Sequence, residues 1–199
     1  MFEIIEIDSG RLDEYGSIPM SHEVKSLFKV DSLHGKPGAT GEGPGGLSLE
    51  EEDVPAPWTK IAAEGADGIE GDPAKYDVSN WAFFLARDDS QPVGGAVVAS
   101  DTDGVWILDG RDDLAVLWDI RVRSDRKRAG VGKALFERAV EWSRGRGLRQ
   151  LKIETQNTNV PACLFYASMG CDLRGIVCHA YAARPETADE VMLLWWLDL

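Results

Sequence analysis

Residues 120–136 read IRVRSDRKRAGVGKALF, and this stretch decides how the rest of the chain is interpreted. It begins as an apolar strand, passes through a basic turn that contains Gly130 and Gly132, and continues with apolar residues at helical spacing. A turn that leads from a strand into a helix directs the free amides of the helix N-terminus outward. The helix dipole adds to their attraction for negative charge. The stretch therefore predicts an anion-binding turn.

The charge of this turn is opposite to that of the whole chain. The 199 residues include 21 Lys and Arg against 34 Asp and Glu, which gives a formal net charge of −13. Between positions 121 and 133 there is one acid, Asp125, and six basic residues: Arg121, Arg123, Arg126, Lys127, Arg128 and Lys133. The overall charge argues against general nucleic-acid binding, which needs cations along the phosphates. It suits a cationic small molecule, and solubility alone is the alternative explanation.

Composition places the chain among globular proteins without membrane spans. A length of 199 residues with 44% hydrophobic content predicts one domain with a full core. The longest apolar runs, WAFFLA and MLLWWL, are far shorter than the roughly 20 residues of a membrane span, and the N-terminus lacks the features of a signal peptide. Cys163, Cys171 and Cys178 form no CxxC pair, so we expect neither a disulfide framework nor a metal site. This use of cysteine predicts a cytoplasmic location.

The pattern around the turn predicts a mixed α/β sheet. Strands are expected at 81–87, 92–100, 114–123 and 148–155, and in LRGIVCHAYAA and EVMLLWWLDL. Helices are expected at 130–144 and 159–169. The strand–helix–strand order implies a right-handed crossover with parallel pairing of 114–123 and 148–155, and we expect the terminal strands to pair antiparallel. In the first half, 34–46 predicts a Gly-rich loop and LSLEEEDVPAP an acidic, turn-prone segment.

Two common phosphate-binding loops do not fit the basic turn. A Walker loop requires G-x-x-x-x-G-K-[ST], and the turn lacks both the first glycine at that spacing and the hydroxyl residue after Lys133. A Rossmann loop requires G-x-G-x-x-G, and Leu135 occupies the position of its third glycine. From pattern alone, a purely structural glycine turn remains the alternative.

The turn nevertheless resembles the coenzyme A loop of the GNAT superfamily of N-acetyltransferases. The family's pattern is [QR]-x-x-G-x-[GA] after a strand that ends in V-x-P, and the matching positions are Val122, Lys127, Gly130 and Gly132. Lys127 stands where the family has Gln or Arg, and Ser124 stands where it has Pro. Because most of this contact is made by the backbone, the resemblance implies that both replacements are tolerated.

A second segment, NVPACLFYASMGC at 159–171, is similar to the family's N-x-x-A-x-x-F-Y-x-x-x-G-F pattern. It matches at Asn159, Ala162, Phe165, Tyr166 and Gly170. The sequences DIRV, ETQNTNVPACLFY and LLWWLDL resemble the streptothricin acetyltransferase branch most closely. The resemblance covers roughly residues 80–199.

The resemblance implies a GNAT-like mixed, mostly antiparallel sheet, flanked by helices, with a central parallel strand pair splayed around the coenzyme A site. Residues 1–199 would form one acetyltransferase domain, in which 80–199 bind acetyl-CoA and 1–79 form the acceptor side. Acetyl-CoA is the implied co-substrate, with no metal. The implied cofactor contacts are Ile120, Val122, Lys127, Arg128, Ala129, Gly130, Val131, Gly132, Lys133 and Asn159.

The implied reaction moves an acetyl group from acetyl-CoA to a primary amine of a small cationic acceptor such as a streptothricin-like antibiotic. A backbone N–H near Val122 would polarise the thioester carbonyl, and Tyr166 would protonate the departing sulfur. Two carboxylates in apolar strands, Asp119 and Glu154, must face a cleft or a partner. We predict Glu154 as general base and Asp119 as ligand of the acceptor's cation; for both, the alternative is a salt bridge, with Arg121 or Lys152.

Some assignments stay open at this point. Tyr181 is expected to wall the acceptor pocket, or else to belong to the core. The acceptor could instead be a protein amine, and the chain could be a non-catalytic acyl-CoA-binding sensor. A homodimer is left open by the sequence.

Overall fold

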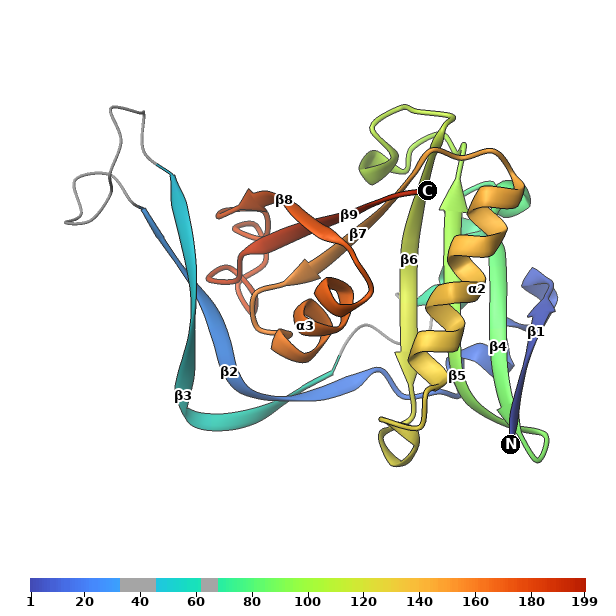
Figure 1. Cartoon of the computed structure of the whole chain (residues 1–199), viewed down its shortest axis with the longest axis horizontal. Coiled ribbons are helices and arrows are strands. Elements are labelled where there is room, and N and C mark those ends of the chain that lie inside the picture. Colours follow the sequence, from blue (N-terminus) through green and yellow to red (C-terminus); the bar gives the residue numbers. More distant parts are fainter. Residues whose placement is uncertain (33–45, 62–67) are drawn as a thin grey trace.

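The computed structural model describes residues 1–32, 46–61 and 68–199. Within these ranges, seven strands form one sheet in the order β1-β4-β5-β6-β7-β9-β8 (Figure 1). The strands are β1 Phe2–Ile7, β4 Ala82–Asp88, β5 Gln91–Ser100, β6 Leu114–Val122, β7 Gln150–Gln156, β8 Asp172–Val177 and β9 Met192–Asp198. The described helices include no segment long and apolar enough to cross a membrane.

The sheet is mixed and mostly antiparallel, as the sequence predicted. β6 and β7 pair parallel, and the other neighbours in the sheet pair antiparallel. β4 and β5 are neighbours in the chain and pair antiparallel as a hairpin. The helix between the parallel strands is α2, Val131–Gly145, and the second predicted helix is α3, Val160–Ser168. Asn159 caps α3, and Pro161 lies in its first turn.

Apolar cores lie on both faces of the sheet. On one face, Phe84 and Ile153 pack with Leu135 and Phe136 of α2, and with α3. On the other face, Leu85, Val97 and Val116 pack with Tyr15 of the short helix α1, Leu12–Gly16. The 3-10 turns η3 (Ile69–Ala74), η4 (Val78–Asn80) and η5 (Trp106–Leu108) contribute to this second core.

Two neighbouring glycines in β5 allow helices to approach both faces closely. A Cβ at Gly94 would lie 2.8 Å from Val131 Cγ1, at the start of α2. A Cβ at Gly95 would lie 2.3 Å from Cε2 of Tyr15. Because successive residues of a strand face opposite sides, this pair makes room for α2 on one face and α1 on the other.

The acidic segment LSLEEEDVPAP is a strand and not the predicted turn. It belongs to β3, Leu47–Ile61, which pairs antiparallel with β2, Ser21–Ser32, as a separate ribbon. Its acidic side chains are exposed and paired across the ribbon: Lys29 Nζ lies 3.0 Å from Glu52 Oε1, and Ser26 Oγ donates to Glu51 at 2.6 Å. Except for Gly46, the predicted Gly-rich loop lies outside the described residues.

The ribbon is fastened to the sheet where β7 ends. The amide of Phe28 donates to the carbonyl oxygen of Asn157, and the Asn157 side chain donates back to the Phe28 carbonyl, both at 2.9 Å. Lys60 forms an ion pair with Glu190 at 2.5 Å. Figure 1 shows the ribbon extending from this attachment past α3.

The predicted strand LRGIVCHAYAA is only half right. β8 ends at Val177, and the residues that follow form turns, with Ala182 N bonded to the His179 carbonyl and Arg184 N to the Tyr181 carbonyl. The turns bring the Tyr181 side chain to β7, where its hydroxyl donates to Glu154. A continued strand would have left β8 without a partner here, because β9 begins only at Met192.

Candidate active site

The two parallel strands stop pairing halfway along their length. β6 and β7 are paired from Leu114 with Gln150 to Leu117 with Ile153, and Figure 1 shows β7 turning away from β6 beyond that point. On the other edge of β6, the register with β5 shifts so that Trp118 has no partner. Such a bulge bends a strand and turns its side chains. The divergence leaves the second half of β6 without a strand partner on the β7 side.

The basic turn ends at this divergence and has an open backbone. Gly130 is the N-cap of α2 with a φ of +84°, and it makes no side-chain cap bond. Among the described residues, no acceptor bonds the amides of Gly130, Val131, Gly132 or Lys133. A Cβ at Gly130 would meet nothing within 4 Å, and one at Gly132 would meet only Val122, at 3.6 Å. Several free N–H groups thus lie at a helix N-terminus, an arrangement that binds anions.

The side chains of the turn carry positive charge beside these amides. Lys127 and Arg128 are exposed and form no ion pair within the described part of the chain. Lys133 lies 3.8 Å from Glu137 one turn along α2, and Arg126 pairs with Asp88 at 3.0 Å. At least two cations of the turn therefore remain available to a phosphate.

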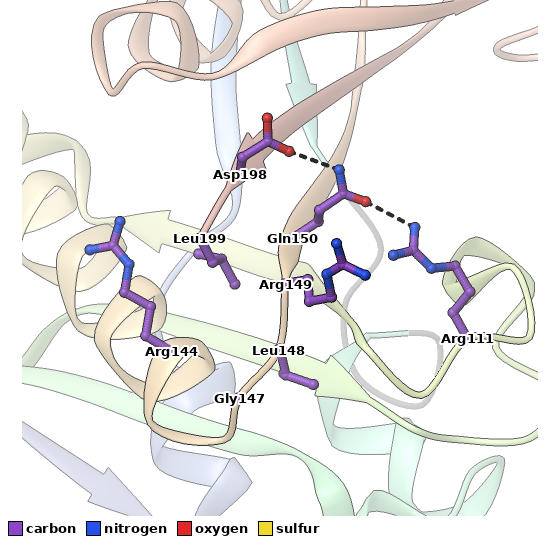
Figure 2. Close-up of a pocket in the computed structure, with 8 residues that line it drawn as sticks. All are labelled: Arg111, Arg144, Gly147, Leu148, Arg149, Gln150, Asp198 and Leu199. Atoms are coloured by element: carbon purple, nitrogen blue, oxygen red, sulfur yellow. Dashed lines mark hydrogen bonds between the residues drawn. The ribbon is translucent and has the colours of Figure 1, made fainter.

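A pocket of about 820 Å³ lies at the opposite end of α2 (Figure 2). Arg111 donates to Gln150, which donates to Asp198, and Arg144, Gly147, Leu148, Arg149 and Leu199 complete the lining. The helix has 15 residues, so about 22 Å separate its two ends. This pocket therefore lies apart from the strand divergence and the free amides.

Tyr166 lies on α3, on the same face of the sheet as α2. Its ring is buried 6.5 Å from that of Phe136 and 6.4 Å from that of Trp195, measured between centroids. Its hydroxyl makes no hydrogen bond to any described residue. Burial raises the pKa of Tyr166, and the negative charge of Asp119 adds to that effect, so the phenol stays protonated at neutral pH.

Asn159 has a defined role at the start of α3. Its side-chain oxygen accepts from the amide of Ala162 at 3.3 Å. This bond satisfies one of the free amides at the helix start. The helix that carries Tyr166 is thereby fixed where β7 ends.

Glu154 lies on β7, just past the last paired position. Its Oε1 accepts hydrogen bonds from the Tyr181 hydroxyl and, at 2.9 Å, from Gln156 Nε2. Its Oε2 has no partner among the described residues. Burial raises the pKa of Glu154, and the bonds from Tyr181 and Gln156 partly oppose that shift. Tyr181, expected from the sequence to wall the acceptor pocket, lies near the site and is also a hydrogen-bond donor to Glu154.

Glu154 also lines a cavity of about 150 Å³ together with Trp106, Ile107, Val116, Leu117 and Trp118. These residues come from η5 and from the two diverging strands. Neither Trp106 nor Trp118 was selected from the sequence, because each looked like an ordinary apolar residue. In the structure Trp106 is 60% exposed, an exposure for which the sequence gives no signal.

Asp119 is buried in an ion pair, the alternative considered from the sequence. Two nitrogens of Arg121 lie 3.0 and 2.6 Å from its carboxylate oxygens, and the Tyr15 hydroxyl donates to it at 2.6 Å. Lys152, in contrast, does not pair with Glu154. It lies 2.7 Å from Asp109 and 4.9 Å from the centre of the Trp196 ring.

Ile120 and Val122 alternate with Asp119 and Arg121 along β6. They are half-buried and pack against the core that includes α2 and α3, so their backbone lies between the basic turn and the divergence. The structure thus places Glu154 just past the last β6–β7 pair and the basic turn directly after β6, whereas Asp119 is held by Tyr15 of α1.

Comparisons with known proteins agree with this arrangement. The model of the Acetyltransferase (GNAT) family matches residues 54–171. A streptothricin acetyltransferase of Escherichia coli is 34% identical over 117 residues, and streptothricin acetyltransferase A of Bacillus subtilis is 35% identical over 115 residues. These matches cover 57% and 58% of this chain and 67% and 61% of the two enzymes, so the similar part is about two thirds of their length.

Solved structures extend the likeness to the whole fold. A crystal structure of a Bacillus anthracis str. Ames protein, described as a streptothricin acetyltransferase with acetyl coenzyme A, superposes with a TM-score of 0.74 at 24% identity. The superposition covers 100% of this chain and 98% of that one. Nourseothricin acetyltransferase gives a TM-score of 0.73 at 26% identity, with 99% and 98% covered. The family match agrees with the free amides of the turn and the diverging strands. The chain therefore belongs to the GNAT family of acetyltransferases and is an acetyl-CoA-dependent acyltransferase.

Proposed function

We propose that this acyltransferase acetylates a primary amine of a small cationic antibiotic of the streptothricin type. The names of its relatives support this acceptor, and so does the net charge of −13. The observation that carries the proposal is the position of Glu154, which lines a small cavity where β6 and β7 diverge and whose Oε2 has no partner among the described residues. Membership of an acetyltransferase family excludes the non-catalytic sensor considered from the sequence.

The turn before α2 would hold the pyrophosphate of coenzyme A. The amides of Gly130, Val131, Gly132 and Lys133 are free to donate, and Lys127 and Arg128 supply charge. Ala129 would line the site without donating to the phosphates, because its amide already donates to the Arg126 carbonyl at 3.4 Å. The backbone of Ile120 and Val122 would bond the pantetheine arm, and the side-chain nitrogen of Asn159 would lie beside it.

The chemical step needs one base and one acid. Glu154 would accept a proton from the substrate ammonium through Oε2, which frees the nitrogen lone pair to form a bond to the acetyl carbon. A β6 amide near Val122 would stabilise the resulting oxyanion. The carbon–sulfur bond then breaks, and Tyr166 would give its proton to the departing thiolate. The nitrogen still carries two hydrogens and a positive charge after the attack, and it loses one of these protons to water as the amide forms. The Tyr166 phenol regains a proton from solvent, and Glu154 releases to solvent the one that it took.

Two further side chains have roles that the geometry supports. Tyr181 would position Glu154, because its hydroxyl donates to Oε1 and leaves Oε2 without a partner among the described residues. For Asp119, the ion pair with Arg121 supports a structural role, and its role as acceptor ligand stays a prediction. Residues 1–79 would form the acceptor side, since Tyr15 contacts Asp119 and Asp72 contacts Trp118.

Location and assembly are also proposals. The three cysteines are free thiols, which suits the reducing cytoplasm where acetyl-CoA is available. Homodimer formation stays a prediction that light scattering can test.

Acetylation of a panel of amines tests the proposed function. The panel contains streptothricin, an aminoglycoside, free lysine and a peptide with a free α-amine. Thiol release is followed in a Cys178→Ser background, and the product is identified by mass. We expect streptothricin to have the highest kcat/KM by at least tenfold. A preference for the peptide would replace this acceptor with a protein amine.

A further inference from the structure

We propose that Trp106, Trp118 and Glu154 form a box for an alkylammonium group, and that Asp72 is the positioning residue that fixes the Trp118 wall. The inference rests on the proposed function only in assuming that the acceptor enters this cavity. The inference names the chemical group that the cavity selects, an alkylammonium, and a residue outside the cavity, Asp72, that fixes one of its walls.

Trp118 is the lining residue whose side chain is least fixed by its own sheet. It is the bulged residue of β6 and has no opposite residue on β5. It also lies one position beyond Leu117, where pairing with β7 ends. Neither neighbouring strand therefore fixes the direction of its side chain, which must be held by contacts from elsewhere in the chain.

Those contacts come from the residues that follow the ribbon. The indole nitrogen of Trp118 donates to Asp72 Oδ2 at 2.7 Å, and Asp72 is only 5% exposed. The Tyr76 ring meets the indole edge-on with centroids 5.8 Å apart, and the Trp81 ring lies 5.2 Å away. A hydrogen bond to a buried carboxylate is stronger than a neutral one and fixes the indole plane. Asp72 thus acts on the cavity through Trp118.

The lining of the cavity is suited to a cation of limited size. An ammonium group is attracted to the faces of indole rings, and the attraction grows when water is excluded. Glu154 lines the cavity together with the two tryptophans, and its carboxylate supplies the negative charge. A volume of about 150 Å³ corresponds to roughly five waters at about 30 Å³ each, enough for the end of an aminoalkyl chain. The box would bind the amine as its cation and bring it to Glu154.

Choline is a suitable probe, because its quaternary nitrogen cannot be acetylated. Its binding to the enzyme in the presence of coenzyme A is measured by calorimetry and compared with that of 3,3-dimethylbutan-1-ol, a neutral molecule of the same shape. We expect choline to bind at least tenfold more tightly. Trp106→Leu and Trp118→Leu should each weaken choline binding by about threefold to thirtyfold. Trp142→Leu, a change on α2 away from the cavity, is the matched control.

Two variants of Asp72 test its positioning role. Asp72→Asn keeps an oxygen that can accept from the indole, whereas Asp72→Leu removes the acceptor. As a positioning residue, Asp72→Leu should raise KM for the acceptor about tenfold while Asp72→Asn stays within about threefold of wild type. If both variants raise KM equally, the Asp72 charge itself binds the acceptor and the positioning role is wrong.

The outcomes separate this inference from the proposed function. Equal affinity for choline and the neutral alcohol, together with normal acetylation of streptothricin, would overturn the box and leave the function. Choline binding that depends on both tryptophans, without acetylation of streptothricin, would keep the box and overturn the acceptor. If Asp72→Leu does not fold, the comparison of Asp72→Asn with the tryptophan variants still decides the matter, because a charge-binding role predicts a loss in Asp72→Asn.

Discussion

Arg121 holds Asp119 in a buried two-point ion pair, with nitrogen–oxygen distances of 3.0 and 2.6 Å along one strand. The guanidinium also donates to the carbonyl of Ile18 at 3.2 Å and lies 4.9 Å from the centre of the Tyr15 ring. Desolvation of Arg121 lowers its pKa, but the bonds to Asp119 outweigh this and raise it overall. The pair therefore joins α1 and the residues after it to the middle of β6.

Asp119→Asn should destabilise the fold more than it affects acceptor binding. The change leaves the Arg121 charge buried with a weaker partner, and breaking a buried pair costs about 3–5 kcal/mol. Urea unfolding measures this loss. The double change Asp119→Leu with Arg121→Met should cost less, because no charge is left unpaired. Normal stability with a raised KM would instead assign Asp119 to the acceptor.

The acid limb of the pH–rate profile should report Glu154. Because burial raises its pKa, we expect kcat/KM to fall as pH decreases through a value above the ordinary glutamate range. Tyr181→Phe removes a bond that lowers this pKa, so the limb should move to higher pH. Glu154→Gln should lose most of kcat and the limb itself. An unchanged limb in Glu154→Gln would exclude Glu154 as the base.

Tyr166→Phe should fold normally and turn over slowly. The hydroxyl has no hydrogen-bond partner among the described residues, so its removal leaves no buried group unsatisfied. A positioned proton donor contributes typically about 10²- to 10⁴-fold to rate. Thermal unfolding and kcat at saturating acetyl-CoA give the two readouts. Wild-type kcat across the pH range would show that another group protonates the sulfur.

Gly130 and Gly170 form a matched pair for testing the coenzyme A turn. Both have a φ of +84°, and a Cβ at either position would meet no atom within 4 Å, so Glu at either position carries the same backbone strain. We expect both variants to lose similar stability. Only Gly130→Glu should lose coenzyme A affinity, by at least a hundredfold in calorimetry. Equal affinity in the two variants would remove the turn from the site.

The three cysteines should differ sharply in reactivity. Burial raises the pKa of Cys163 to about 12 and that of Cys171 to about 11, whereas Cys178 is exposed. A disulfide reagent should therefore modify one thiol rapidly in the native enzyme and all three in denaturant. Cys178→Ser should abolish the rapid phase. A rapid phase that survives this change would place a second thiol at the surface.

Much of the sheet could be predicted because its signals are local. Apolar runs bounded by turn residues indicated β4 to β7, and the glycine turn fixed where α2 begins. The β2–β3 ribbon could not be found in this way, because contacts such as Asn157 with Phe28 join residues that are far apart in sequence. Its exposed acidic strand also lacks the apolar alternation that marks a strand.

The site was predicted unevenly for a related reason. Glu154 and Asp119 have similar sequence surroundings, and only the geometry separates them. The bulge at Trp118 interrupts the alternation of β6, so Asp119 turns to Tyr15 and the core beneath α1. The sequence pattern of β6 does not predict this bulge. The supporting bond from Asp72 to Trp118 spans 46 positions and is equally invisible in sequence.

The short ladder between Leu114–Leu117 and Gln150–Ile153 is the seam of the sheet: among the described strands, it is the pairing that joins the half that ends at β6 to the half that begins at β7. Pantetheine contains amide groups of its own, so a bound co-substrate can continue the ladder past Leu117 like a missing strand. Acetyl-CoA would then hold the two parts of the sheet together in addition to supplying the acetyl group. Amide hydrogen exchange should slow on both sides of the seam when it binds, most of all in the second half of β6, while the β2–β3 ribbon exchanges at its former rate.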